Sequence, residues 1–186
     1  RRVVAHLGAA SGGYAERAVA PVAALHTVDG HVAPEVAVAA IGTGRTALAV
    51  LEIAAIGPED TVVIPAAAGG LGALLTQGAL RAGAEVVALA GGPAKVDRAR
   101  ALGATFAFDY NNPTWPEAVR DALDGAAATV VLDGVGGGTG RQALELLGTG
   151  GRVVVFGWSS GEPTPITTMD VVGRGITVDG AVGPRI

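Results

Sequence analysis

The chain has 186 residues, a net charge of −4 and no cysteine, with 49% hydrophobic and 16% charged residues. This length suffices for one packed domain and part of a second, and the charge excludes a basic surface for nucleic acid. Without cysteine there is no disulfide, thiol nucleophile or zinc knuckle, and His6, His26 and His31 lack a metal-ligand spacing, so we expect no metal site.

The sequence pattern before residue 34 predicts little regular structure. Residues 3–7 and 14–20 are strand-like runs separated by glycines, as in an antiparallel pair with a turn. From residue 34 to about 56 an alanine-rich helix follows, interrupted at Gly42 and Gly44. The apolar runs are broken well before about 18 residues, and no signal peptide is visible, so we expect no membrane span and a cytoplasmic location.

After residues 57–60 short apolar runs alternate with longer amphipathic ones. Strands are predicted at 61–65, 85–90, 105–108, 129–133, 152–156 and about 176–182, and helices at 71–82, 93–102, 115–124 and 139–148. Strands that are apolar on both faces and separated by helices indicate a doubly wound parallel sheet, the Rossmann fold. In such sheets ligands bind beyond the carboxyl ends of the strands, so we expect site residues directly after each apolar run.

The first turn at that edge is rich in glycine. Residues 62–72 are VVIPAAAGGLG, so that a strand ends at Pro65 and a helix follows. Gly69 lets backbone N–H groups approach a phosphate at the positive end of the helix, and Gly72 permits close packing of the helix on the strand. The alternative is a tight turn that requires glycine for a positive φ. The flanking strand and helix favour a site for the pyrophosphate of a dinucleotide.

The end of the second predicted strand selects the cofactor. NAD sites usually place Asp or Glu there, but residues 85–90 are followed by Gly91. Lys95 lies on the next helix, where a charge-assisted hydrogen bond of about 1.5–3 kcal/mol to a 2′-phosphate would favour NADPH over NADH roughly 10- to 100-fold. For the other cations of this helix, Arg98 and Arg100, we favour a solvated face that pairs with Asp97.

Several stretches that together cover most of the chain follow one another in a distinctive order. They are GGYAERAVAP at 12–21, GRTAL at 44–48, the run from 62 to 104, DY at 109–110, VVLDGVGG at 130–137 and GGRVVVFG at 150–157. The chain therefore resembles the quinone oxidoreductase (zeta-crystallin-like) branch of the medium-chain dehydrogenases/reductases. The resemblance implies a remnant of a GroES-like catalytic domain at 1–33 and a Rossmann dinucleotide-binding domain at 34–186. Because the zinc ligands of other relatives are cysteine and histidine, it also implies the zinc-free branch.

The resemblance implies roles for individual residues. Thr46 would lie beside the nicotinamide, and Lys95 and Tyr110 would bind the 2′-phosphate of NADPH, although Tyr110 is equally consistent with a half-buried aromatic at a strand end. The other cofactor-binding residues would be Ala68, Gly69, Gly70, Leu71, Gly91, Gly134, Val135, Phe156, Gly157 and Ser159. Asp133 is expected to hydrogen-bond the turn that follows it, not to act in catalysis. Trp158, where the family has a smaller residue, would either narrow the nicotinamide end or cover exposed core.

The implied function is an NADPH-dependent, zinc-independent oxidoreductase that transfers hydride to a quinone or an α,β-unsaturated carbonyl. We expect the catalytic side chains in family regions that this sequence lacks, so the catalytic residues are unknown and turnover by the isolated chain is left open. Two alternatives stay open, a non-catalytic NADPH-binding protein and an enoylreductase module of a larger synthase. A methyltransferase is disfavoured, because it would require an acid at the end of the second strand and an antiparallel final hairpin. The implied partners are a small-molecule substrate and a second copy that pairs through the edge of the sheet.

Overall fold

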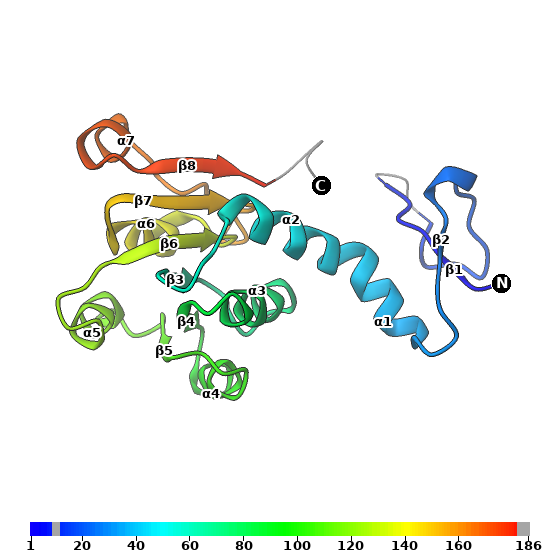
Figure 1. Cartoon of the computed structure of the whole chain (residues 1–186), viewed down its shortest axis with the longest axis horizontal. Helices are drawn as coiled ribbons and strands as arrows, with labels where there is room; N and C mark the ends of the chain where they lie inside the picture. Colours follow the sequence, from blue (N-terminus) through cyan, green and yellow to red (C-terminus); the bar gives the residue numbers. More distant parts are fainter. Residues whose placement is uncertain (9–11, 182–186) are drawn as a thin grey trace. The chain divides into compact units, whose positions relative to one another are not determined.

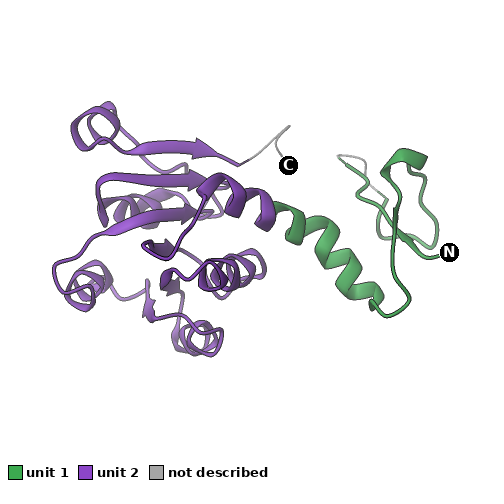
Figure 2. Ribbon diagram, in the orientation of Figure 1, with its two compact units in different colours: residues 1–46 green, residues 47–186 purple. Residues whose placement is uncertain are grey.

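A computed structural model describes residues 1–8 and 12–181 of the chain. The chain divides into two compact units, Arg1–Thr46 and Ala47–Ile186 (Figure 2). The division falls inside a helix, 13 residues beyond the predicted domain boundary at 33/34. The assignment of residues 1–33 to a GroES-like domain stays a prediction.

The second unit is built on a six-stranded parallel sheet in which the described strands have the order β5-β4-β3-β6-β7-β8 (Figure 1). The strands are β3 Thr61–Ile64, β4 Glu85–Ala90, β5 Phe106–Asp109, β6 Ala128–Asp133, β7 Leu147–Val155 and β8 Thr177–Gly180. The helices are α2 Arg45–Ala54, α3 Gly70–Arg81, α4 Pro93–Ala101, α5 Trp115–Ala122, α6 Gly137–Glu145 and α7 Thr168–Arg174. This order reverses direction between β3 and β6, which is the Rossmann arrangement and confirms the predicted fold.

Two apolar layers hold the helices against the sheet. Because successive strand residues point to opposite faces, Val62 and Ile64 pack with α2, α3 and α4, while Val63 between them packs with α5 and α6. All three side chains are fully buried. The strands are therefore apolar on both faces for the reason that the sequence pattern predicted, since helices cover both sides.

Three elements of the second unit, α6, β7 and α7, differ from the prediction. Helix α6 ends at Glu145 and β7 begins at Leu147, because the pairing of β6 with β7 shifts register between Ala128 and Val130 and takes in residues that were assigned to the helix. Helix α7 was not predicted at all. The final strand β8 runs parallel to β7, which excludes the antiparallel hairpin of a methyltransferase. The predicted end of this strand at residue 182 lies outside the described residues.

The first unit corrects the predicted strand at 14–20. Strand β1 (Val3–Val4) pairs antiparallel with β2 (His26–Thr27), and residues 14–20 form no strand. The alternation of apolar and polar residues there has no buried face behind it, since Tyr14 and Val19 are fully exposed. The antiparallel pair exists, but its second strand comes after the 3₁₀ turn Val22–Ala24. The predicted turn residue Ser11 lies outside the described residues.

One helical stretch runs without interruption from Pro34 to Ala54. It consists of α1 (Pro34–Ala39), a π-helical turn (Ala40–Gly44) and α2, so Gly42 and Gly44 change the helical pitch instead of breaking the helix. By length and composition alone this helix of 21 residues could cross a membrane, a test that does not decide whether it does. Core helices of soluble proteins pass the same test, and the cytoplasmic location stays a prediction.

Candidate functional site

The loop between β3 and α3 lies at the carboxyl edge of the sheet. Its positive backbone φ is found at an alanine and not at a glycine. The positive φ of this turn, +54°, belongs to Ala66, whereas the N-cap residue Gly69 has an ordinary φ of −72°. The alternative that Gly69 and Gly72 serve a positive φ is therefore wrong. At Gly72 the need for glycine is space, because an added Cβ would overlap the Ala66 carbonyl oxygen and lie 2.8 Å from the Ala67 Cα.

The amino terminus of α3 borders a cavity of about 290 Å³. No side chain among the described residues caps this helix, so the N–H groups of its first turn have no capping partner. The cavity is lined by Pro65, Ala66, Gly69, Gly70, Leu71, Gly72, Gly134, Phe156 and Ser159. Six of these, Gly69, Gly70, Leu71, Gly134, Phe156 and Ser159, are predicted site residues, brought together from the ends of β3, β6 and β7.

A second, smaller cavity of about 90 Å³ lies at the ends of β4 and β5. Its lining residues are Ala66, Ala68, Gly69, Ala90, Gly91, Lys95 and Tyr110. All three residues that were assigned to the 2′-phosphate end, Gly91, Lys95 and Tyr110, belong to it. Ala66 and Gly69 line both cavities, so the glycine loop separates two adjoining spaces, one on each side of the switch in strand order.

Gly91 is in close contact with the ring of Tyr110. A Cβ added at Gly91 would lie 3.0 Å from both Cε2 and the hydroxyl oxygen of Tyr110. The backbone N–H of Tyr110 also donates to Ala90 O over 3.1 Å, which fixes the tyrosine beside the end of β4. A side chain at Gly91, such as the acid found in NAD sites, would therefore require the Tyr110 ring to shift.

Lys95 lies in the first turn of α4 and is exposed. It is the one lysine of the sequence, and it makes no ion pair within the described part of the chain. Arg100 on the same helix pairs with Asp97 over 2.9 Å, with both side chains largely exposed, as predicted. The cation that lines the cavity is thus free to meet an anionic ligand, while Arg100 belongs to the solvated face.

The turn after β6 is fixed by Asp133, which is fully buried. Its Oδ1 accepts hydrogen bonds from the backbone N–H groups of Val135 (2.8 Å) and Gly136 (3.0 Å), and Thr164 donates its hydroxyl proton to Oδ2. This confirms the expectation that Asp133 binds the turn. Every Asp133 oxygen has a structural partner, so the side chain holds Gly134 in place at the wall of the larger cavity.

Three predicted site residues do not line either cavity. Thr46 belongs to the first unit, where its hydroxyl donates to Gly42 O over 3.4 Å. Val135 and Gly157 flank the larger cavity, and a Cβ added at Gly157 would be 3.3 Å from Gly134 O. Trp158 is 58% exposed and is not among the residues that line the cavity, so its role at the nicotinamide end stays a prediction.

Some lining residues were missed by the residue assignments. Pro65, Ala66 and Gly72 line the larger cavity and Ala90 the smaller one. They contribute backbone and small side chains with no functional group, so nothing in their chemistry distinguishes them. Their position, at the end of β4 for Ala90 and between the end of β3 and the first turn of α3 for the others, is the signal that could have found them.

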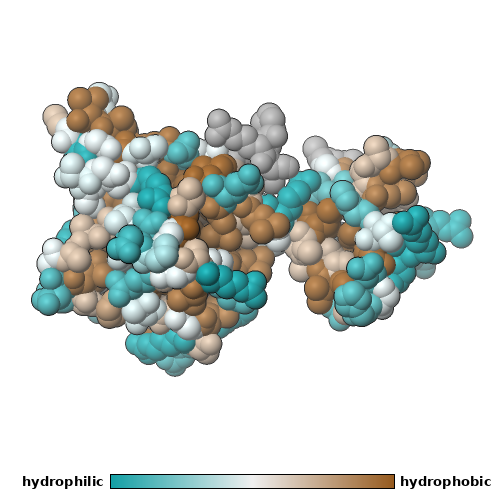
Figure 3. Space-filling view, in the orientation of Figure 1, coloured by the Kyte–Doolittle hydropathy of each residue, from teal (hydrophilic) through white to brown (hydrophobic). Residues whose placement is uncertain are grey.

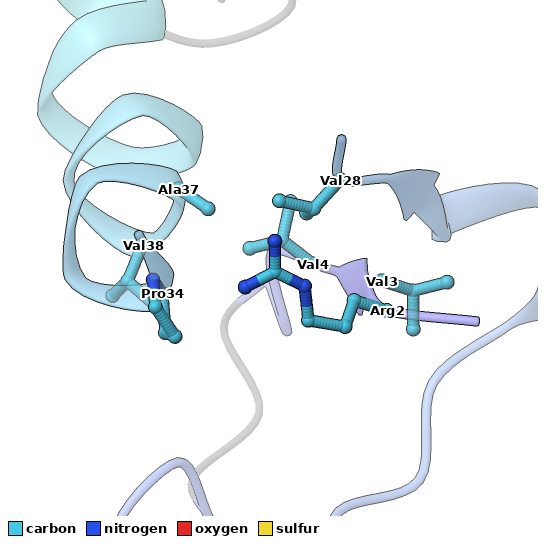
Figure 4. Close-up of a pocket in the computed structure, with 7 residues that line it drawn as sticks. All are labelled: Arg2, Val3, Val4, Val28, Pro34, Ala37 and Val38. Atoms are coloured by element: carbon cyan, nitrogen blue, oxygen red, sulfur yellow. The ribbon is translucent and has the colours of Figure 1, made fainter. Parts of the chain in front are cut away.

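A third cavity, of about 190 Å³, lies within the first unit (Figure 4). Its walls are apolar except for Arg2, whose guanidinium donates to the carbonyl oxygens of Asp29 and Gly30 over 2.6 and 2.8 Å. The remaining lining residues are Val3, Val4, Val28, Pro34, Ala37 and Val38. None of them carries an acid, a base or a nucleophile. Across residues 1–8 and 12–181 no group of three or more side chains could hold a metal ion.

The strand order, the uncapped glycine turn and the two cavities that it separates define a Rossmann domain of the dehydrogenase and reductase class. Residues 70–185 match the family described as zinc-binding dehydrogenase. The chain is 33% identical over 116 residues to a 2-haloacrylate reductase of a Burkholderia species, covering 62% of this chain and 35% of that protein.

Two solved structures are similar over most of the chain. The quinone oxidoreductase of Thermus thermophilus, whose complex with NADPH is also known, has a TM-score of 0.79 and 32% identity, over 97% of this chain and 56% of that one. An NAD-dependent alcohol dehydrogenase has a TM-score of 0.81 and 34% identity, over 91% and 50% of the two chains. The chain thus spans between a third and about half of these relatives. It belongs to the zinc-binding dehydrogenase family.

Proposed function

We propose that the second unit binds NADPH across the carboxyl edge of its sheet, as the cofactor half of a reductase of quinones or α,β-unsaturated carbonyls. The observation that carries the proposal is the loop at Ala66–Gly69, which borders both cavities. A dinucleotide has two ends joined by a pyrophosphate, and such a ligand requires two spaces with a phosphate-binding turn between them.

The residues present fit this group. At Gly72 no side chain can be accommodated, which keeps α3 close to β3 and its first N–H groups near the ligand. Around the larger cavity the lining residues are glycines and apolar side chains except for Ser159, which suits a flat nicotinamide ring with one polar substituent. Around the smaller cavity an unpaired cation and a phenol hydroxyl suit a phosphate.

In this proposal Lys95 and Tyr110 bind the 2′-phosphate, and the backbone of Gly69, Gly70 and Leu71 binds the pyrophosphate. Ala68 and Gly91 border the adenosine end. The nicotinamide end is bordered by Gly134, Val135, Phe156, Gly157 and Ser159. The assignment of Thr46 to the nicotinamide stays a prediction. When bound, NADPH supplies a hydride that reduces the substrate. The part of these residues is to hold the ring in one orientation and to exclude water from one of its faces.

The experiment that tests the cofactor assignment compares NADPH and NADH affinities of the wild type and of Lys95→Ala. Lys95 is exposed, so we take the lower end of the range for a charged hydrogen bond, about 1.5 kcal/mol, or roughly tenfold in NADPH affinity. NADH affinity should not change. Arg98→Ala is the matched control, since it removes a cation from the same helix away from the cavity lining.

Equal losses for the two nucleotides in Lys95→Ala, or no loss, would show that the lysine does not bind the 2′-phosphate. Absence of NADPH binding by the wild type would refute the proposed function itself. Oxidation of NADPH in the presence of a simple quinone would distinguish a reductase from a binding protein without turnover.

We also propose a homodimer that forms through β8, the outer described strand of the sheet. Apolar side chains are exposed beside this edge on α7, where Figure 3 shows brown surface: Met169 and Val172 are 72% and 77% exposed. A parallel edge strand with open backbone groups and apolar neighbours is prone to pair with another chain. Sedimentation of the wild type and of Val172→Glu tests this, with a shift from dimer to monomer expected.

A further inference from the structure

Asp109, the last residue of β5, connects the two strands that border the smaller cavity. It pairs with Ala90 in the register of β4 and β5. Its Oδ1 accepts a hydrogen bond from the backbone N–H of Gly92 (2.8 Å) and another from that of Asn111 (2.9 Å). One carboxylate oxygen thus joins the turn after β4 to the turn after β5.

The hydrogen bonds continue from Gly92 to the cavity lysine. Gly92 has a φ of +86°, which favours glycine, and directly precedes α4. Its carbonyl oxygen accepts from the backbone N–H of Lys95 over 3.1 Å, while its own N–H donates to Asp109. Gly92 therefore links the Asp109 carboxylate, through hydrogen bonds on its N–H and its carbonyl oxygen, to the backbone of Lys95.

On the other side, Asp109 is covalently followed by Tyr110. The tyrosine ring lies against Gly91, and its N–H donates to Ala90 O. Asp109 is therefore connected to Lys95 through Gly92 and to Tyr110 through the chain itself. These are the two side chains of the smaller cavity whose polar groups can bind a phosphate.

We propose that Asp109 is a positioning residue that fixes Lys95 and Tyr110 at the spacing required by the 2′-phosphate, and so contributes to selectivity for NADPH without touching it. This inference rests on the proposed function. A carboxylate near a phosphate would ordinarily repel it. Here the two backbone N–H groups hold the pKa of Asp109 below its usual range and offset the charge of the oxygen that they bind.

The test measures the affinities of the full chain for NADPH and NADH in the wild type, in three variants of Asp109 and in one control variant. Asp109→Ala removes the acceptor and should weaken NADPH binding roughly tenfold while NADH binding is retained. Asp109→Asn keeps an oxygen acceptor and should retain selectivity within about twofold. Asp109→Glu keeps the charge but moves it by one methylene group and should lose selectivity as Ala does. Asp97→Ala, which removes a carboxylate from α4 outside the cavity lining, is the control for charge alone.

A thermal melt of each variant separates positioning from unfolding. If Asp109→Ala does not fold, the comparison between Asn and Glu decides the question. Any of three results would overturn the inference. Asp109→Ala could weaken NADPH and NADH binding equally, Asp109→Asn could lose the preference for NADPH while Asp109→Glu keeps it, or Asp109→Asn could bind NADPH more tightly than the wild type. The proposed function fails separately, and only if the wild type does not prefer NADPH.

Discussion

Replacing Gly72 with alanine tests whether the glycine loop holds α3 against β3. The new Cβ would overlap the Ala66 carbonyl oxygen and lie 2.8 Å from the Ala67 Cα, both backbone atoms that no rotamer change can move. Overpacking of this kind costs about 1–3 kcal/mol, and the gain in helix propensity from glycine to alanine offsets about 0.5–1 kcal/mol of it. With rigid neighbours we expect the upper end, a net loss of about 2 kcal/mol, or a Tm lower by roughly 4–8 °C.

Gly70→Ala is the matched control, because it makes the same chemical change in the same turn of α3. A Cβ added at Gly70 meets no atom within 4 Å, so its Tm should stay within about 2 °C of the wild type. Thermal melts of the two variants, followed by circular dichroism, give the comparison. If Gly72→Ala melts within a degree of Gly70→Ala, the close approach of helix and strand does not constrain the fold and the reasoning is refuted.

Two further predictions concern a buried carboxylate and a strained turn. Hydrogen bonds from Arg141 and Thr167 hold the pKa of Asp170 well below its usual range, so its contribution to stability is present above about pH 4 and is lost as the pH falls through the folded pKa. Asp170→Asn should lower Tm at pH 7, and the difference in Tm from the wild type should stay constant down to about pH 4 and shrink only below it; parallel curves below that pH would contradict this. Ala66→Gly should relieve the left-handed φ and raise Tm by about 1–4 °C, from a net gain of about 0.5–1 kcal/mol, whereas an unchanged or lower Tm would argue against strain there.

Much of the second unit could be predicted because its local signals agree with its tertiary contacts. Strand β4 occupies the predicted residues 85–90, since an apolar run flanked by Glu85 and Gly91 is buried on both faces by helices. The same agreement predicted that the site lies at the carboxyl ends of the strands, because these ends meet at one edge of a parallel sheet. The family resemblance, and not the local pattern, then supplied most of the individual residues. Gly91 and Lys95 could be assigned from their position after β4, before any contact was known.

The prediction failed where the local sequence pattern does not match the contacts that the segment makes in the fold. Residues 14–20 alternate like a strand but bury nothing, as the exposure of Tyr14 and Val19 demonstrates. Helix α7 is short, but its signals were present: Thr167 and Asp170 form a capping box, and Gly175 ends the helix in the left-handed region. Asp109 was noted only as part of a motif, because its hydrogen bonds reach a turn 17 residues away that periodicity does not connect to it.

The single lysine of the sequence has a practical consequence because it lines the smaller cavity. Apart from the amino terminus, the chain offers one primary amine to an acylating reagent, and that amine lies at the proposed phosphate end. Covalent labelling would therefore be site-directed without any mutation. A nucleotide that occupies the cavity should slow acylation of Lys95, so the mass of the peptide that contains Lys95 becomes a readout of occupancy for any ligand, coloured or not.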